Sequence, residues 1–135
     1  MKPDERIAAL QRIPLFAEVP PKELRDVQEA LSERAFSAGA TIASQGSRGI
    51  GFFMIETGEA DVVVDGGAVR RLGPGDYFGE IALLTEGTRT ASVTAVTDLT
   101  CLVLDAWHFR PLLRRNPELS WALLQALAKQ VTGDS

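Results

Sequence analysis

One stretch of the chain, residues 78–91, combines groups that could bind an anion. Gly79 lacks a Cβ, so backbone N–H groups there can approach an anion closely, and residues 80–84 can form a short helical turn with an open, partly positive N-terminus. Arg89 carries a planar guanidinium that can pair with two phosphate oxygens at once. An ionised Glu80 only accepts hydrogen bonds and would suit a sugar hydroxyl. Together these groups predict a site for a ribose with a phosphate close by.

Each of these residues also has a simpler explanation when it is taken alone. Glu80 could be a surface carboxylate that favours the start of a helix, and Arg89 could form a surface ion pair of little energetic value. The Thr90 hydroxyl could contact a ligand or continue the Thr/Ser edge of a strand. The spacing of Glu80 and Arg89, between Gly79 and a predicted strand, favours ligand binding.

The stretch FGEIALLTEGTRTA resembles the phosphate-binding cassette of the cyclic nucleotide-binding domain family, approximately F-G-E-(I/L)-A-L-L-x(n)-P-R-(T/S/A)-A. Thr88 departs from the pattern, because the family often has proline there. The resemblance extends through a turn at residues 72–76 and a helix at residues 109–114, and covers nearly the whole chain. The matching cassette residues are Phe78, Gly79, Glu80, Ile81, Ala82, Leu83, Leu84, Arg89, Thr90 and Ala91.

The resemblance implies a cyclic nucleotide ligand, cAMP or cGMP, and no catalytic cofactor. It places Arg89 and the N–H groups of residues 79–82 on the cyclic phosphate, and Glu80 on the ribose 2′-hydroxyl. It also places Val69 in an apolar base pocket, on the strand before the turn at residues 72–76. The nucleotide-binding residues that it implies are Val69, Phe78, Gly79, Glu80, Ile81, Ala82, Arg89 and Thr90.

The sequence indicates the phosphate-binding residues more clearly than it indicates whether the base of the nucleotide is adenine or guanine. A hydroxyl residue directly after the arginine, here Thr90, resembles the arrangement that favours cGMP in eukaryotic kinases. Many bacterial cAMP-binding members of the family also have Ser or Thr at this position. We expect cAMP to be the preferred ligand, with cGMP bound as well.

Composition narrows the function classes. The 135-residue chain is 45% hydrophobic and 24% charged, which is typical of one soluble globular domain. Its net charge of −4 argues against direct nucleic-acid binding, and no apolar run is long enough to span a membrane. The N-terminus lacks the features of a secretory signal, so we expect a cytoplasmic protein. The single cysteine, Cys101, excludes an internal disulfide and is expected to be a small buried hydrophobic residue.

The ends of the chain have helical patterns. We expect a helix over residues 4–13, ended by Pro14, and a second helix after Pro20 and Pro21 whose inward face carries Leu24, Val27 and Leu31. The N-terminal helices therefore occupy about residues 4–32. Residues from 106 to 131 are expected to form two more helices, separated at Asn116 and Pro117. The solvated face of the second helix is expected to carry Lys22, Glu23, Arg25, Asp26 and Glu29.

The middle of the chain, about residues 35–104, has short apolar or alternating runs separated by glycine-rich turns. The predicted strands include residues 52–55, 61–65 and 90–95, the last with the period-two alternation of a half-buried strand. Turn signals at roughly 8–12-residue spacing favour an all-β roll over βαβ units. The predicted fold is α+β but mainly β: an antiparallel, jelly-roll-like β-roll of about eight short strands, flanked by helices, in a single domain over residues 1–135.

The last predicted helix, residues 117–131, is more apolar than one packed on a single domain needs to be. We expect it to cover a nucleotide base, a second subunit or an effector domain, and to pivot near Asn116 and Pro117 when ligand binds; a permanently packed helix is the alternative. Trp121, on its first turns, is expected to be a core residue rather than a ligand contact. His108, the single histidine, is expected to be a partly exposed packing residue.

Three function classes are compatible with these patterns. The leading class is a regulatory cyclic nucleotide-binding module without catalysis. A metal-dependent enzyme on a β-barrel is nearly excluded, because one histidine outside the strands cannot supply the ligands. The third class is a degenerate domain that binds no ligand and serves in dimerisation. Within the leading class, the sequence is compatible with a stand-alone receptor and with the sensor half of a longer transcription regulator, channel, kinase or acyltransferase. We expect no helix-turn-helix domain within these 135 residues.

Overall fold

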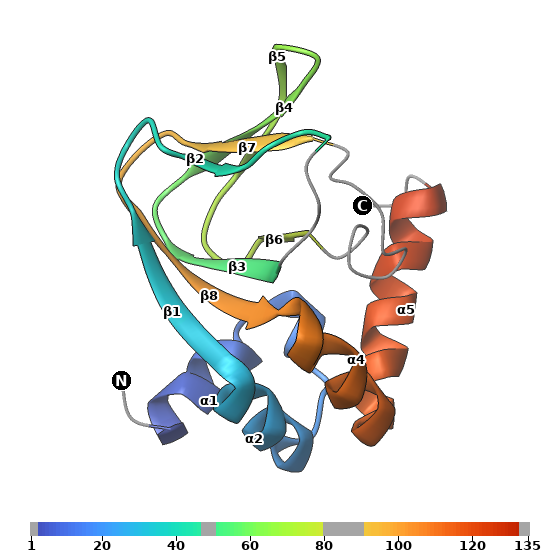
Figure 1. Ribbon diagram of the computed structural model, residues 1–135. Coiled ribbons are helices and arrows are strands. Elements are labelled where there is room, and N and C mark those ends of the chain that lie inside the picture. Colours follow the sequence, from blue (N-terminus) through green and yellow to red (C-terminus); the bar gives the residue numbers. More distant parts are fainter. Residues whose placement is uncertain (1–2, 47–50, 80–90, 133–135) are drawn as a thin grey trace. The chain divides into compact units, whose positions relative to one another are not determined.

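The computed structural model describes residues 3–46, 51–79 and 91–132 (Figure 1). Contacts divide the chain into two compact units. The first unit, Leu31–Phe109, contains the strands, and the second unit, Met1–Ala30 together with Arg110–Ser135, is helical. The helix α4, Ala106–Arg115, begins in the strand unit and ends in the helical unit.

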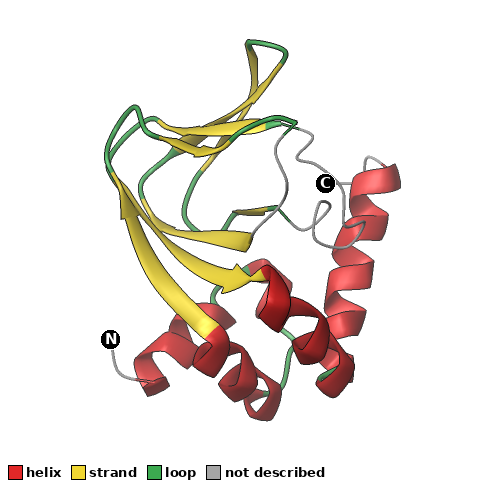
Figure 2. Ribbon diagram, in the orientation of Figure 1, coloured by secondary structure: helices red, strands yellow, loops and turns green. Residues whose placement is uncertain are grey.

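The strand unit is an antiparallel roll of two four-stranded sheets, drawn in yellow in Figure 2. The strand orders are β1-β8-β3-β6 and β2-β7-β4-β5, and every pairing is antiparallel. With helices before and after it in the chain, the roll confirms the predicted fold class. The strands are β1 Leu31–Phe36, β2 Thr41–Ala43, β3 Gly51–Thr57, β4 Ala60–Val64, β5 Gly67–Leu72, β6 Tyr77–Phe78, β7 Ser92–Ala95 and β8 Leu99–Asp105.

The inner faces of the two sheets form one apolar core. Strands alternate their side chains between two faces, so every second residue of a strand can enter this core. Burying these side chains removes apolar surface from water and is the main favourable contribution to the stability of the roll. The core residues are Ala43, Phe53, Ile55, Ala60, Leu72, Phe78, Val93, Ala95, Leu99, Cys101 and Val103, with Phe36, Ile42 and Val62 partly buried against them.

The hairpin of β4 and β5 turns at Asp65 and Gly66, both with positive φ angles of 50° and 82°. An Asp-Gly pair suits such a tight hairpin turn, because both positions need this left-handed backbone. Gln45 holds the tip of the hairpin: its Nε2 donates to Asp65 Oδ1 at 3.0 Å and its Oε1 accepts from Asp65 N at 2.9 Å. The hairpin is therefore fixed to the turn that follows β2 as well as to its strand neighbours.

The helical unit contains α1 Pro3–Gln11, the short 3-10 helix η1 Pro14–Phe16, α2 Pro21–Ala30 and α5 Pro117–Thr132, besides the second half of α4. α1 contacts α2, and α5 contacts η1. Among the described side chains, the buried apolar residues of this unit are Leu10, Ile13, Leu15, Phe16, Val19, Leu24, Val27, Leu112, Leu119 and Leu123.

Glu23 of α2 caps the start of α5. Its carboxylate accepts hydrogen bonds from Leu119 N at 2.8 Å and Glu118 N at 3.2 Å. Only 9% of Glu23 is exposed, so its assignment to a solvated helix face was wrong. The first N–H groups of a helix have no partner within the helix, and a carboxylate from α2 supplies one here.

Asn116 joins α4 to α5 in the same region. Its Nδ2 donates to Leu112 O at 2.8 Å, which caps the end of α4, and to Asp26 Oδ2 at 3.2 Å. Ser120 Oγ donates to Leu113 O at 2.7 Å. The predicted break at Asn116 and Pro117 is confirmed, and the joint is held by side-chain hydrogen bonds.

Several predicted boundaries differ from the structure. Leu31 is the first residue of β1 and pairs with Leu104, so the second helix ends at Ala30. A buried leucine fits the end of a helix or the start of a strand, and Leu31 belongs to the strand because it pairs with β8. The first helix ends at Gln11, two residues early, and η1 comes after it. The strand predicted over residues 90–95 begins at Ser92, with Ala91 in a bend.

None of the helices within the described residues is both long enough and apolar enough to span a membrane.

Candidate functional site

β6 anchors the chain where the predicted cassette begins. Phe78 pairs with Phe53 across β6 and β3, and their rings stack with centroids 5.0 Å apart and planes 1° from parallel. Both rings belong to the inner core, and Phe78 is 8% exposed. Its neighbour Tyr77 pairs with Met54 and packs on the Phe52 ring, with centroids 5.4 Å apart. The predicted site residue Phe78 is therefore a core residue, and it fixes the point where the cassette sequence leaves the sheet.

The turn before β6 is held by a closed set of hydrogen bonds. Gly75 N donates to Ile55 O and Ile55 N donates to Asp76 O, each at 2.9 Å. The Asp76 carboxylate accepts from Gly73 N at 2.8 Å. The turn predicted at residues 72–76 is confirmed, and it links β5 and β6 rigidly to β3.

Gly79 comes directly after β6 and has a φ angle of 98°. This left-handed backbone is one that other residues rarely adopt, so a glycine suits the point where the chain leaves the sheet. The predicted site residues Glu80, Ile81, Ala82, Arg89 and Thr90 lie outside the described residues.

The far end of the cassette is anchored by β7. Val93 and Ala95 are buried in the core, while Ser92 and Thr94 are half-buried, which confirms the predicted alternation. Ser92 Oγ accepts a hydrogen bond from Gln45 N at 2.8 Å. Residues on both sides of the cassette are thus fixed to the roll.

Val69, the predicted base-pocket residue, lies at an irregularity of β5. Val62 pairs with Arg70 and Val63 pairs with Ala68, so Val69 is an extra residue in the ladder, a β-bulge. It is 63% exposed. The predicted strand position is confirmed, and a bulge is a common device for directing side chains near a functional site.

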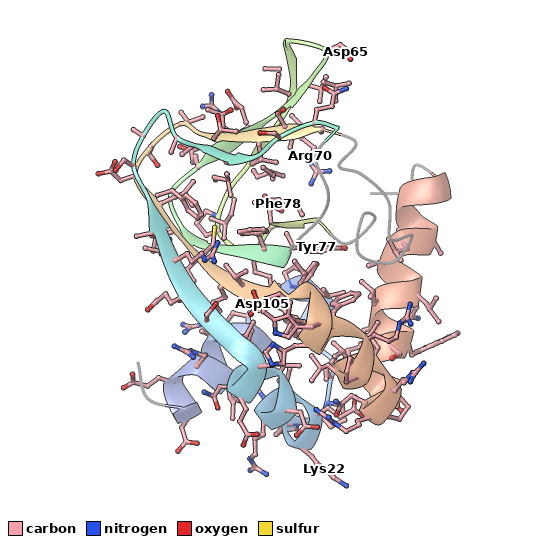
Figure 3. All side chains as sticks on the ribbon, viewed as in Figure 1. Lys22, Asp65, Arg70, Tyr77, Phe78 and Asp105 are labelled. Carbon is pink, nitrogen blue, oxygen red and sulfur yellow. The ribbon has the colours of Figure 1, made fainter. Side chains whose placement is uncertain are left out.

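Arg70 follows Val69 in β5 and is not one of the predicted site residues. It pairs with Val62, whose side chain packs against the inner core, so Arg70 lies on the inner face of its sheet. In Figure 3 the labelled Arg70 and Phe78 both point toward the inside of the roll. The Asp-Gly turn and the alternation of β4 indicate from the sequence which face each residue of β4 occupies. The bulge at Val69 shifts the alternation of β5 by one residue, so the face of Arg70 does not follow from the turn alone.

Arg71, the next residue, lies on the opposite face. It pairs with Asp61, and its Nε donates to Asp61 Oδ1 at 3.0 Å. This hydrogen bond, with the charge of the carboxylate, raises the pKa of Arg71. Two adjacent arginines therefore have different surroundings, because one is paired on the outside and the other faces inward.

The remaining sequence candidates have structural roles. Cys101 is fully buried, as predicted for a small hydrophobic residue, and this burial raises the pKa of its thiol to about 12. His108 is half-exposed, with Nδ1 3.8 Å from Asp105 Oδ2. Trp121 is 58% exposed, so its expected place in the core was wrong. In the described part of the chain, no three His, Cys, Asp or Glu side chains gather as metal ligands.

Comparisons with known proteins agree on one family. The sequence profile described as "Cyclic nucleotide-binding domain" matches residues 33–116. The cAMP-dependent protein kinase regulatory subunit of Aspergillus niger is 39% identical over 108 residues, which cover 78% of this chain and 26% of that protein. The chain thus spans about a quarter of the length of this curated relative.

Two solved structures of kinase regulatory subunits resemble the whole fold. The regulatory domain of Toxoplasma gondii protein kinase A, crystallised with cAMP, has a TM-score of 0.82 and 26% identity, covering 94% of this chain and 50% of that one. The regulatory subunit of a cAMP-independent protein kinase A from Trypanosoma brucei has a TM-score of 0.84 and 26% identity, covering 96% and 46%.

Proposed function

This chain belongs to the cyclic nucleotide-binding domain family, and from that membership we propose that it is a regulatory module that binds a 3′,5′-cyclic nucleotide without chemically changing it. The observation that carries the proposal is the position of the cassette sequence. It begins directly after β6, which is fixed by the Phe53–Phe78 pair, and ends before β7, which is fixed in the core. The structure thus gives a rigid frame to both ends of a sequence that suits a ribose phosphate.

Each group of the cassette has a distinct role in this proposal. Arg89 and the N–H groups of residues 79–82 bind the cyclic phosphate, and Glu80 accepts a hydrogen bond from the ribose 2′-hydroxyl. Val69 and Thr90 lie toward the base. The ligand is cAMP or cGMP, and cAMP is the nucleotide with which the similar regulatory domain of Toxoplasma gondii was crystallised.

The proposed output is a change in the position of α5. Trp121 and Leu124 of this helix are 58% and 59% exposed, which leaves an apolar surface for a second subunit or an effector domain. A ligand can drive such a change only if it binds one position of the helix more tightly than the other. Saturating nucleotide should then slow amide exchange in residues 117–131 and alter Trp121 emission. The emission is measured in a Trp107→Phe background, because Trp107 is the other tryptophan of the chain.

Calorimetric titration with cAMP and cGMP tests the binding site itself. Arg89→Ala should cost about 2–5 kcal/mol of binding free energy, because it leaves a phosphate charge unpaired. Glu80→Ala should cost about 1.5–3 kcal/mol, the value of a hydrogen bond to a charged acceptor. Arg25→Ala, an exposed arginine on α2, is the control and should leave both affinities unchanged. Equal affinities for wild type and Arg89→Ala would contradict the assignment of the phosphate.

A further inference from the structure

Three turns of the strand unit meet at the end of the roll that lies away from α4 (Figure 1). β8 begins at this end with Leu99 and reaches α4 at its other end. Ala38 N donates to Asp98 Oδ1 at 2.8 Å, which joins the turn after β1 to the turn before β8. Glu59 N donates to Thr97 Oγ1 at 3.0 Å, which joins the turn after β3 to the same place. Hydrogen bonds therefore hold the three turns together.

The cassette sequence leaves the sheet at the opposite end of β3. Phe78, just before the cassette glycine, pairs with Phe53 near the start of β3, whereas Thr57 is the last residue of that strand. A strand rises about 3.4 Å per residue, so the distance along β3 from Phe53 to Thr57 is about 14 Å. A site at the far end of the roll is thus separate from the proposed nucleotide site and does not depend on the proposed function.

A hollow of about 270 Å³ lies at this far end and is open to solvent. Its lining combines apolar and polar side chains from the ends of three neighbouring strands, all within the strand unit. A cavity of about 150 Å³ is large enough for benzene, so this hollow has room for a group of several heavy atoms. The lining residues include Phe36, Thr57, Asp98, Leu99 and Thr100.

The polar groups of the hollow are mainly hydrogen-bond acceptors. Thr57 Oγ1 and Thr100 Oγ1 are 2.8 Å apart and share one hydrogen bond, which leaves more lone pairs than hydrogens on the two hydroxyls. The Asp98 carboxylate accepts from Ala38 N and makes no other hydrogen bond or ion pair within the described ranges 3–46, 51–79 and 91–132. The hollow therefore fits a group that brings hydrogen-bond donors.

The charged residues around the hollow are all acidic. Residues 35–41, 56–61 and 95–100 contain no lysine, arginine or histidine, and their acidic residues are Glu56, Glu59, Asp61 and Asp98. Asp61 is paired with Arg71, whereas Glu59 and Asp98 are exposed to solvent. Such surroundings attract a cation and repel an anion. The fitting donor is therefore a positively charged one.

We infer that this hollow binds a primary alkylammonium group, either the amine of a small molecule or the side chain of a lysine in a partner protein. An ammonium has three N–H donors and no acceptor. These donors are directed at the Asp98 carboxylate and at the hydroxyls of Thr57 and Thr100, while the carbon chain lies along the apolar lining at Phe36. A lysine side chain has this combination of an apolar stem and a charged end.

The test is a titration of the isotope-labelled protein with n-butylammonium chloride at neutral pH, followed by NMR of the backbone amides. The amide signals of Ala38, Asp98 and Thr100 should shift along one saturating curve. Two matched probes, n-butanol and butyltrimethylammonium, should bind at least about 5-fold more weakly, because the first lacks the charge and the second lacks the N–H donors.

An acetylated and amidated Gly-Lys-Gly peptide separates the two sources of the ammonium group. If the peptide shifts the same amide signals with an affinity within about 5-fold of n-butylammonium, the site accepts lysine side chains. If only n-butylammonium binds there, the site takes a free amine. Both results support an alkylammonium site.

Asp98→Asn removes the charge but keeps an oxygen that can accept from Ala38 N, so the turn is retained. It should weaken n-butylammonium by about 5-fold or more and leave n-butanol unchanged. The matched control is Glu59→Gln, which removes an exposed carboxylate from the same end of the roll but outside the lining of the hollow. It should change the affinity by less than about 2-fold.

Three results would overturn the inference. The first is an absence of shifts in wild type, and the second is equal binding of the three probes, a comparison that needs no variant and so holds even if Asp98→Asn does not fold. The third is an equal loss in Asp98→Asn and Glu59→Gln, which would indicate a diffuse attraction of cations to acidic residues. In each case the proposed function still stands, because the titration with cAMP and cGMP tests it separately.

Discussion

Replacing Glu23 should loosen the start of α5, which lies far from it in sequence. The Glu23 carboxylate accepts from Glu118 N at 3.2 Å and Leu119 N at 2.8 Å, so Glu23→Ala leaves two N–H groups of α5 without this acceptor. Loss of a capping side chain costs about 0.5–2 kcal/mol. Loss of a negative charge at a helix N-terminus adds about 0.3–1 kcal/mol. We expect the free energy of unfolding to fall by about 1–3 kcal/mol.

Urea denaturation monitored by far-UV circular dichroism measures this change as a lower midpoint at an unchanged slope. The matched control is Glu29→Ala, an exposed glutamate on the same helix. It should stay within about 0.5 kcal/mol of wild type, as most surface substitutions do. If Glu23→Ala is no less stable than Glu29→Ala, the cap contributes nothing and the reasoning is refuted.

Two further predictions concern the roll. Gly58→Ala should lower the free energy of unfolding by more than about 3 kcal/mol, because a Cβ there would collide with Asp98 O and Leu99 and the φ angle is 90°. Gly66 has a φ angle of 82° but open space around it, so Gly66→Ala should cost only about 1–2 kcal/mol in the same denaturation assay. The pKa of the Cys101 thiol is raised from 9.0 to about 12 in the fold, so the stability from keeping it neutral is present below about pH 9 and is lost as the pH rises toward 12. Above pH 9, the free energy of unfolding of wild type should therefore fall more steeply than that of Cys101→Ala, by up to about 1.4 kcal/mol per pH unit, and equal slopes would contradict the burial of the thiol.

Local patterns were enough to predict the parts of the site that depend on neighbours in sequence. The turn at residues 72–76, the alternation of Val93 and Ala95, and the burial of Cys101 depend on residue type and spacing, and the structure has them all. These features need no knowledge of the rest of the chain. The same holds for the break at Asn116, because proline comes directly after it.

Features that depend on distant partners were missed. Glu23 fits a solvated helix face by its spacing, and only the position of α5 shows that its carboxylate is a cap. The inward position of Arg70 was missed because of the bulge at Val69. Without this bulge, the alternation of β5 would place Arg70 and the residues after it on the opposite face of the sheet. Trp121 was expected in the core on the basis of its residue type, but it lies on the exposed side of α5. The buried residues of this helix are Leu119 and Leu123.

The contacts at the start of α5 also set a condition on the proposed signal. A pivot of α5 alone at Asn116 and Pro117 would separate the Glu118 and Leu119 N–H groups from Glu23, at a cost of about 1–3 kcal/mol. A ligand moves such an equilibrium only by its difference in affinity for the two positions. Nucleotide would therefore have to bind the pivoted form about 5- to 140-fold more tightly merely to offset the lost cap. This difference lies within the coupling energies of ordinary allosteric proteins, so the cost of breaking the cap is compatible with the proposed movement of α5.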